Sequence, residues 1–154
     1  MTDNRIPKIK KEPYVSNNPR AIESPGRTDH LTPSWRFSLI DHDHELWGWD
    51  KIKDSELMSI IKTHLKSFEK LTWAAIKATK HHHHEIELKK FSRDAKKRLE
   101  DLKLEDTDSL FSLRLASTIR LYGIRDGSIY KIIWHDPHHK WGDPKSAYPL
   151  DSKS

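Results

Sequence analysis

The segment from Leu110 to Trp134 constrains the fold more than any other part of the chain. Apolar and polar residues alternate through it, which is the period of a half-buried strand. Between two such runs, 119–125 and 128–135, stands the pair Asp126-Gly127. This pair is favoured in two-residue hairpin turns because both residues can take a positive φ. We therefore predict antiparallel strands around a turn at Asp126-Gly127.

The turn also predicts which residues face each other across the hairpin: Ile124 and Ile129, Tyr122 and Lys131, Arg120 and Ile133. One side of the hairpin is then apolar enough to pack on helices, and it carries Ile119, Leu121, Tyr130, Ile132 and Trp134. The opposite side mixes Arg120, Tyr122 and Lys131 with isoleucines. A mixed surface of this kind suits a partner protein or a nucleic-acid strand.

Further elements precede the hairpin. Residues Trp35–Ile40 alternate as a strand does, and apolar residues recur at helical spacing between Leu57 and Phe68. A short turn follows a cap at Thr72, and another helix is predicted from Ser92 to Leu102. His81–His84 are interpreted as an exposed loop. The order β-α-α-β-β-β predicts an α+β fold, with an antiparallel sheet and helices packed on one face.

The length of 154 residues favours a single domain. Residues 1–33 contain five prolines among small and basic residues, so we predict a flexible N-terminal tail. The polar stretch 142–154 is predicted to be a second flexible tail. The folded α+β domain is therefore expected to span residues 34–141.

The composition narrows the class of protein. The net charge of +5 makes a polyanion a plausible partner, although 28 basic residues stand against 23 acidic ones. The chain has no cysteine, which excludes a disulfide scaffold and any cysteine-ligated zinc site. No signal peptide is recognisable, and no apolar run approaches the ~20 residues of a membrane span. We expect a soluble cytoplasmic protein with no membrane partner.

A polar cluster, 134–139, follows the hairpin and is the leading candidate for a functional site. Cleavage of RNA requires a base for the ribose 2′-hydroxyl, an acid for the leaving 5′-oxygen and cations for the phosphorane. The predicted catalytic residues are His135, Asp136, His138 and His139. The predicted RNA-binding residues are Arg114, Arg120, Tyr122, Arg125 and Lys131.

The same histidines are also of the type that binds a metal ion, with Asp41-His42-Asp43-His44 as further ligands. Neither group has a recognised zinc spacing, so we expect no metal site and no cofactor. A metal-dependent hydrolase is kept as a third interpretation.

Several segments resemble a group of small, mostly uncharacterised bacterial proteins, and the match covers roughly residues 34–141. The segments are Trp35-Arg36-Phe37-Ser38, Leu71-Thr72-Trp73, Phe111–Leu115, Arg120–Gly127 and Ile132–His139. The element order is also similar to that of the RelE/ParE toxin superfamily, whose members are toxins of type II toxin–antitoxin modules. In that superfamily the RelE branch cleaves mRNA on the ribosome and the ParE branch acts on gyrase.

The resemblance implies a toxin-like endoribonuclease, with an antitoxin-like protein and RNA or the ribosome as partners. RelE-type catalysis uses basic and aromatic residues of the sheet, which are matched here only by type, by Arg114, Arg120, Arg125, Tyr130 and Lys131. The histidine-rich end and the long N-terminal segment depart from the family pattern. The alternative is a non-enzymatic module that binds a protein or a nucleic acid with the mixed side of the sheet.

Overall fold

The computed structural model describes residues 28–79 and 82–149. Its strands are β2 (Ser34–Arg36), β3 (His84–Glu87), β4 (Ser109–Arg114), β5 (Arg120–Asp126) and β6 (Ile129–Asp136). Its helices are α3 (Asp54–Ser59), α4 (Lys66–Phe68), α5 (Trp73–Lys77) and α6 (Arg93–Asp101). A π-helical stretch, η2 (Ile60–Leu65), joins α3 to α4, and two 3₁₀ turns complete the list, η1 (Trp49–Lys51) and η3 (Leu88–Lys90).

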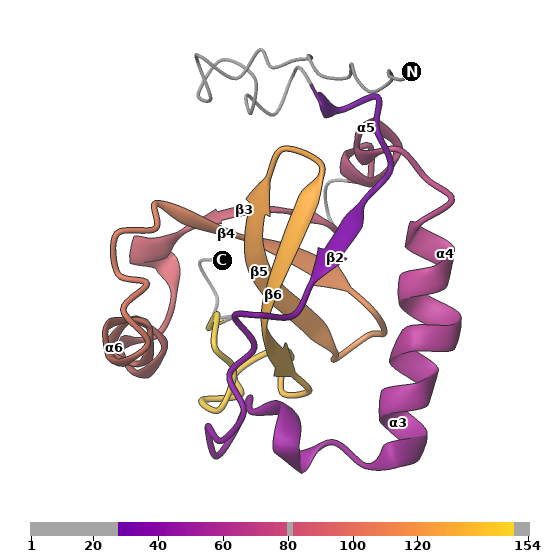
Figure 1. Cartoon of the computed structure of the whole chain (residues 1–154). Coiled ribbons are helices and arrows are strands. Elements are labelled where there is room, and N and C mark those ends of the chain that lie inside the picture. Colours follow the sequence, from indigo (N-terminus) through magenta and orange to yellow (C-terminus); the bar gives the residue numbers. More distant parts are fainter. Residues whose placement is uncertain (1–27, 80–81, 150–154) are drawn as a thin grey trace, which may run out of the picture.

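The strands form one sheet in the order β2-β6-β5-β4-β3, antiparallel except for β2, which runs parallel to β6 (Figure 1). This confirms the α+β class. The predicted first strand is shorter than expected, because Phe37 and the residues after it leave the sheet. A further strand, β3, begins at His84, so the interpretation of the whole histidine run as an exposed loop is wrong at that residue.

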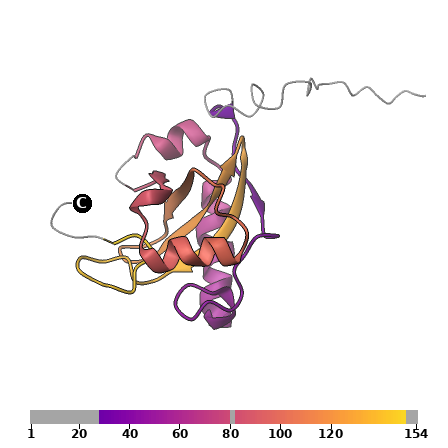
Figure 2. The same ribbon diagram turned by 90° about the vertical axis from the view of Figure 1, so that its left-hand side faces the viewer.

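Helices cover both faces of the sheet, so the prediction of helices on one face is wrong. The helical segment α3–η2–α4 and α5 lie on one side, and α6 crosses the other side (Figures 1 and 2). The first core contains Leu65, Trp73, Phe111, Leu121 and Tyr130. The second core contains Ala95, Leu99, Leu110, Tyr122 and Ile133. The mixed side of the hairpin is therefore largely core beneath α6, not an open surface.

The hairpin turn lies one residue beyond the predicted position. Asp126 pairs with Ile129, so the two turn residues are Gly127 and Ser128. Gly127 has φ +66° and is the only one of the two with a positive φ, as in a type II′ turn. Ile124 consequently faces Lys131 and not Ile129.

A β-bulge changes the register again in the middle of the hairpin. Gly123 pairs with Ile132 whereas Tyr122 pairs with Trp134, so Ile133 is the extra residue. A Cβ at Gly123 would overlap the Lys131 carbonyl oxygen, and glycine permits this close approach. The bulge moves Trp134 to the α6 side, where it joins the second core. The prediction that Trp134 shares a side with Ile132 is therefore wrong.

The folded part extends beyond the predicted limits of 34–141. Before β2, Asp29 forms ion pairs with Lys77 and Arg125. After Trp141, the segment 142–149 packs on the domain, with Ser146 and Ala147 at 1% and 0% exposure. The rest of the two predicted tails, 1–27 and 150–154, lies outside the described residues. No helix of the described chain is both long and apolar enough to cross a membrane.

Candidate functional site

Two arginines stand opposite each other where β4 ends and β5 begins. Arg114 pairs with Arg120 in the antiparallel register, which places both side chains on the α6 face of the sheet. Arg120 is 8% exposed, and its Nη1 donates to the carbonyl oxygens of Ala116 at 2.7 Å and Ile119 at 3.1 Å. Burial lowers the pKa of Arg120. Within residues 28–79 and 82–149, neither arginine forms an ion pair with a carboxylate; Arg120 donates to backbone carbonyl oxygens instead, and the half-buried Arg114 is the more accessible of the two.

His139 lies beside this arginine pair. Its backbone N–H donates to the carbonyl oxygen of Thr118, in the loop between β4 and β5, at 3.0 Å. Its Nδ1 lies 3.4 Å from the hydroxyl of Tyr122, and its ring stacks on Tyr148 at an interplanar angle of 12°. Burial, and after it the charge of Arg120, lowers the pKa of His139 to about 4. His139 is therefore a neutral imidazole at pH 7.

The histidine run contributes to the same end of the sheet. His84 pairs with Ser112 in the register of β3 and β4, and it therefore shares a face with Arg114. The backbone N–H of Arg114 donates to His83 Nδ1 at 3.1 Å, and burial lowers the pKa of His83 to about 4. We call Arg114, Arg120, Tyr122, His139 and His84 the Arg–His cluster. No local pattern indicates that His84 belongs to it, because its position depends on the pairing of β3 with β4.

Two of the four predicted catalytic residues instead support the fold. Asp136 is fully buried and accepts hydrogen bonds from the backbone N–H of His138 at 2.8 Å and of Ala147 at 2.9 Å. Burial raises the pKa of Asp136. His135 is 7% exposed and packs edge-on against Trp49, and burial lowers its pKa. His135 pairs with Leu121 and therefore lies on the opposite face of the sheet from Arg114 and Arg120, and Asp136 is enclosed by the segment that contains Ala147.

His138 is the remaining predicted catalytic residue. Its backbone is held by Asp136, whereas its half-buried imidazole has no hydrogen-bond partner in the described part of the chain. It is the neighbour of His139 in sequence. His138 is therefore the one predicted catalytic residue whose imidazole is neither deeply buried nor hydrogen-bonded within the described part of the chain.

The other predicted RNA-binding residues do not join the cluster. The Arg125 side chain is 2% exposed, pairs with Asp29 at 2.6 Å and lies 4.5 Å above the Trp73 ring. Lys131 pairs with Asp126 at 3.2 Å, beside the hairpin turn. Both lie near the turn, at the far end of β5 and β6 from Arg120. Tyr122 is within the cluster but is 0% exposed, so it can act only through His139.

The segment 41–44, considered above as a source of metal ligands, forms a different site. Asp41 accepts hydrogen bonds from Arg98 Nε at 2.8 Å and Nη2 at 2.6 Å, and from Trp134 Nε1 at 2.8 Å. Burial alone would raise the pKa of Asp41, but the hydrogen bonds from Arg98 and Trp134 outweigh it and lower the pKa.

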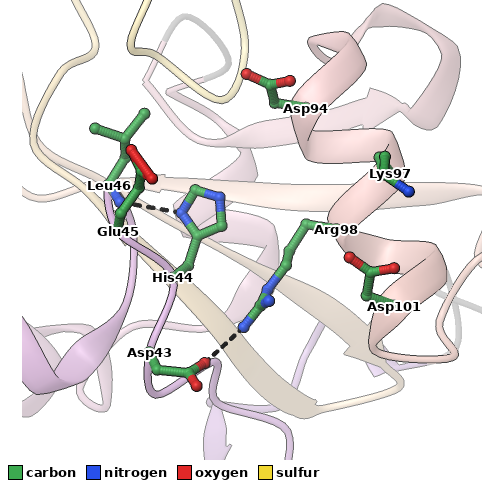
Figure 3. A pocket seen from close by; sticks show the side chains of 8 residues that line it. All are labelled: Asp43, His44, Glu45, Leu46, Asp94, Lys97, Arg98 and Asp101. Carbon is green, nitrogen blue, oxygen red and sulfur yellow. Dashed lines mark hydrogen bonds and ion pairs between the residues drawn. The ribbon is translucent and has the colours of Figure 1, made fainter.

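Next to this pair is a polar pocket of about 450 Å³, lined by residues of the 43–46 loop and of α6, including Arg98 (Figure 3). Arg98 also donates to Asp43 at 2.7 Å, and His44 stacks on Trp47. No group of three or more His, Asp or Glu residues suited to a metal ion occurs among the residues that the structure describes.

Comparison with protein-family models, curated proteins and solved structures gave no match. Function is therefore inferred from the chemistry of the site.

The packing of the C-terminal segment against the cluster gives a first prediction. We expect Asp136→Ala to release residues 142–149, because the buried N–H of Ala147 would lose its acceptor. Trypsin should then cut after the exposed Lys145 roughly tenfold faster than in the wild type. Mass spectrometry of brief digests would measure this, with the exposed α6 variant Asp101→Asn as the control. An unchanged rate at Lys145 would show that Asp136 does not hold the segment.

Proposed function

We propose that this protein is a toxin-like endoribonuclease of a toxin–antitoxin module, acting in the cytoplasm by metal-independent acid–base catalysis. The observation that carries the proposal is the neutral, half-buried His139 beside Arg114 and Arg120. A base next to two cations that form no ion pair with a carboxylate among the described residues matches the needs of RNA cleavage. An antitoxin-like protein is the proposed partner.

The proposed reaction is an internal transfer at phosphorus. His139 removes the proton of a ribose 2′-hydroxyl, and the resulting oxyanion attacks the adjacent phosphorus. The bond to the 5′-oxygen breaks, and His138 supplies the proton that this leaving oxygen takes up. The products are a 2′,3′-cyclic phosphate and a 5′-hydroxyl. Arg114 and Arg120 stabilise the negative charge on the phosphorane oxygens.

Tyr122 positions the base. With its hydroxyl accepting from Nδ1–H of His139, the Nε2 atom is unprotonated and can take the substrate proton. Burial keeps the pKa of Tyr122 well above its ordinary value, so the hydroxyl stays neutral. The stack on Tyr148 fixes the ring plane of His139.

A second function is favoured by one specific observation. Arg120 is almost fully buried and is held by carbonyl oxygens of the 116–119 loop, so its positive charge is fixed in place and adds to that of the half-buried Arg114 at the same end of the sheet. The alternative is therefore a non-enzymatic module that binds a nucleic-acid backbone at the Arg–His cluster. The two functions share the binding step and differ in whether RNA is cut.

The shared step gives a second prediction. A short fluorescent single-stranded RNA should bind the full-length protein, and affinity should fall steeply as salt rises because phosphate contacts release counterions. Arg114→Ala should weaken binding roughly tenfold, whereas Lys131→Ala should change it less than about twofold. Fluorescence anisotropy against protein concentration measures both. Equal effects of the two substitutions, or no binding by the wild type, would exclude a phosphate site at the cluster.

A further inference from the structure

An apolar groove runs between the start of the folded chain and the long helical segment. Two adjoining hollows, of about 440 and 360 Å³, share Phe37, Ile61 and Leu65 as lining residues. Phe37 is 45% exposed and Ile61 is 44% exposed, so large apolar side chains face water on both sides of the groove. Surface patches of this kind mark interaction sites.

The helix beside the groove has an unusual geometry. Residues 60–65 are π-helical, and this wider turn brings Ile60 and Leu65 to the same side of the helix, at 4% and 3% exposure. Ile61 is left at the surface, where it lines both hollows. Short π-helical stretches are frequent at functional sites.

The other wall of the groove is an edge strand. β2 lies at one edge of the sheet and pairs on one side only, with β6. Trp35 of β2 and the following Phe37 line the first hollow. An edge strand with an apolar groove beside it is the arrangement to which an extended peptide adds as a further strand.

The charged residues that line the groove indicate the charge of the segment that it binds. Lys62 and Lys66 line it and form no ion pair among the described residues. The two acidic residues of the lining are already engaged, Glu69 by Trp35 Nε1 at 2.8 Å and Asp50 by His42 at 3.3 Å. The indole N–H is neutral and leaves the charge of Glu69 in place, so in the first hollow two lysines stand against one carboxylate and the net charge is positive.

We propose that this groove binds an extended, acidic segment of a partner protein, whose apolar side chains enter the two hollows while its carboxylates meet Lys62 and Lys66. The inference does not depend on ribonuclease activity. It places the partner beside β2, away from the side of the hairpin that was predicted from the sequence, of which Tyr122 and Ile133 belong to the core beneath α6.

Selection from a random peptide library displayed on phage, with the full-length protein as bait, tests the proposal. Enriched peptides should be acidic with apolar residues at alternate positions. In anisotropy measurements the best peptide should bind Ile61→Asp at least about tenfold more weakly, and Lys62→Glu/Lys66→Glu also more weakly. Met58→Asp is the matched control, because Met58 is as exposed as Ile61, at 44%, but does not line either hollow. It should change the affinity less than about twofold.

Three results would overturn the proposal. The first is that no peptide is enriched, or that the enriched peptides are basic. The second is displacement of the peptide by the single-stranded RNA used above, which would assign the groove to RNA. The third is a wild-type dimer in sedimentation experiments that Ile61→Asp, but not Met58→Asp, converts to monomer, because the occupant would then be a second copy of this chain. Loss of RNA cleavage alone would leave the peptide result unchanged, so the two proposals fail separately.

Discussion

Arg98→Ala is expected to lower the free energy of unfolding by about 3–5 kcal/mol, because it leaves a buried carboxylate without its cation. Asp41 is 1% exposed and receives two hydrogen bonds from Arg98. After the substitution, the indole N–H of Trp134 would be its one remaining side-chain donor among the described residues. The pair also connects the 41–50 loop to α6, so its loss would loosen the cover of the second core.

Urea denaturation followed by tryptophan fluorescence measures this loss. Lys97→Ala is the matched control, since Lys97 is the exposed neighbour of Arg98 on α6, and its effect should stay within about 0.5 kcal/mol. The double variant Asp41→Asn/Arg98→Ala should be more stable than Arg98→Ala, because it removes the unpaired charge. A loss below about 1 kcal/mol for Arg98→Ala would mean that the ion pair contributes little.

The same pair predicts a dependence on pH. The folded-state pKa of Asp41 is lowered, so the stability that the pair contributes is present above the unfolded pKa of about 4 and is lost as the pH falls through the folded value. The difference in stability between the wild type and Arg98→Ala should therefore narrow in acid.

The second large effect concerns catalysis. His139→Gln should reduce the rate of RNA cleavage about 10²–10⁴-fold while RNA binding changes little, because glutamine keeps a polar group near Tyr122 but cannot act as a base. His42→Gln is the control, since this histidine is exposed and pairs with Asp50, away from the Arg–His cluster. Thermal unfolding of each variant would show whether the fold is retained. Equal rates for wild type and His139→Gln would exclude His139 as the base.

The pH profile distinguishes this role from a structural one. A base must be unprotonated, and the pKa of His139 is lowered to about 4. The rate of RNA cleavage should therefore stay constant as the pH falls below 6.5 and should decline only near pH 4–5. A decline centred near 6.5 would assign the base to an ordinary, solvated histidine.

The fold class could be predicted from the sequence because alternation and helical spacing are local signals. Neither the turn nor the register of the hairpin could be predicted, since Gly127-Ser128 is as good a turn pair as Asp126-Gly127 and the bulge at Ile133 is not visible in the alternation. That one extra residue moves Trp134 to the other side of the sheet. The same error of register hides the face on which α6 packs. The core that α6 covers contains Tyr122, Ile133 and Trp134, which the predicted register does not place together.

The candidate site was predicted in part. Arg114, Arg120, Tyr122 and His139 were named from the sequence and do lie together. His135 and Asp136 were named by residue type, but exposure is a tertiary property, and the 142–149 segment that buries Asp136 had been predicted to be a flexible tail. His84 and the ion pair of Asp41 with Arg98 depend on contacts between residues far apart in the chain, which no local pattern indicates.

The most direct test of the proposed function is the structure of the RNA ends made by the purified full-length protein. Incubation with a short single-stranded RNA in the presence of EDTA should give 2′,3′-cyclic phosphate and 5′-hydroxyl ends, which mass spectrometry identifies. His139→Gln and Arg114→Ala should each suppress these products, and His42→Gln should not. Intact RNA after incubation with the wild type, or cleavage that persists in His139→Gln, would contradict the proposal.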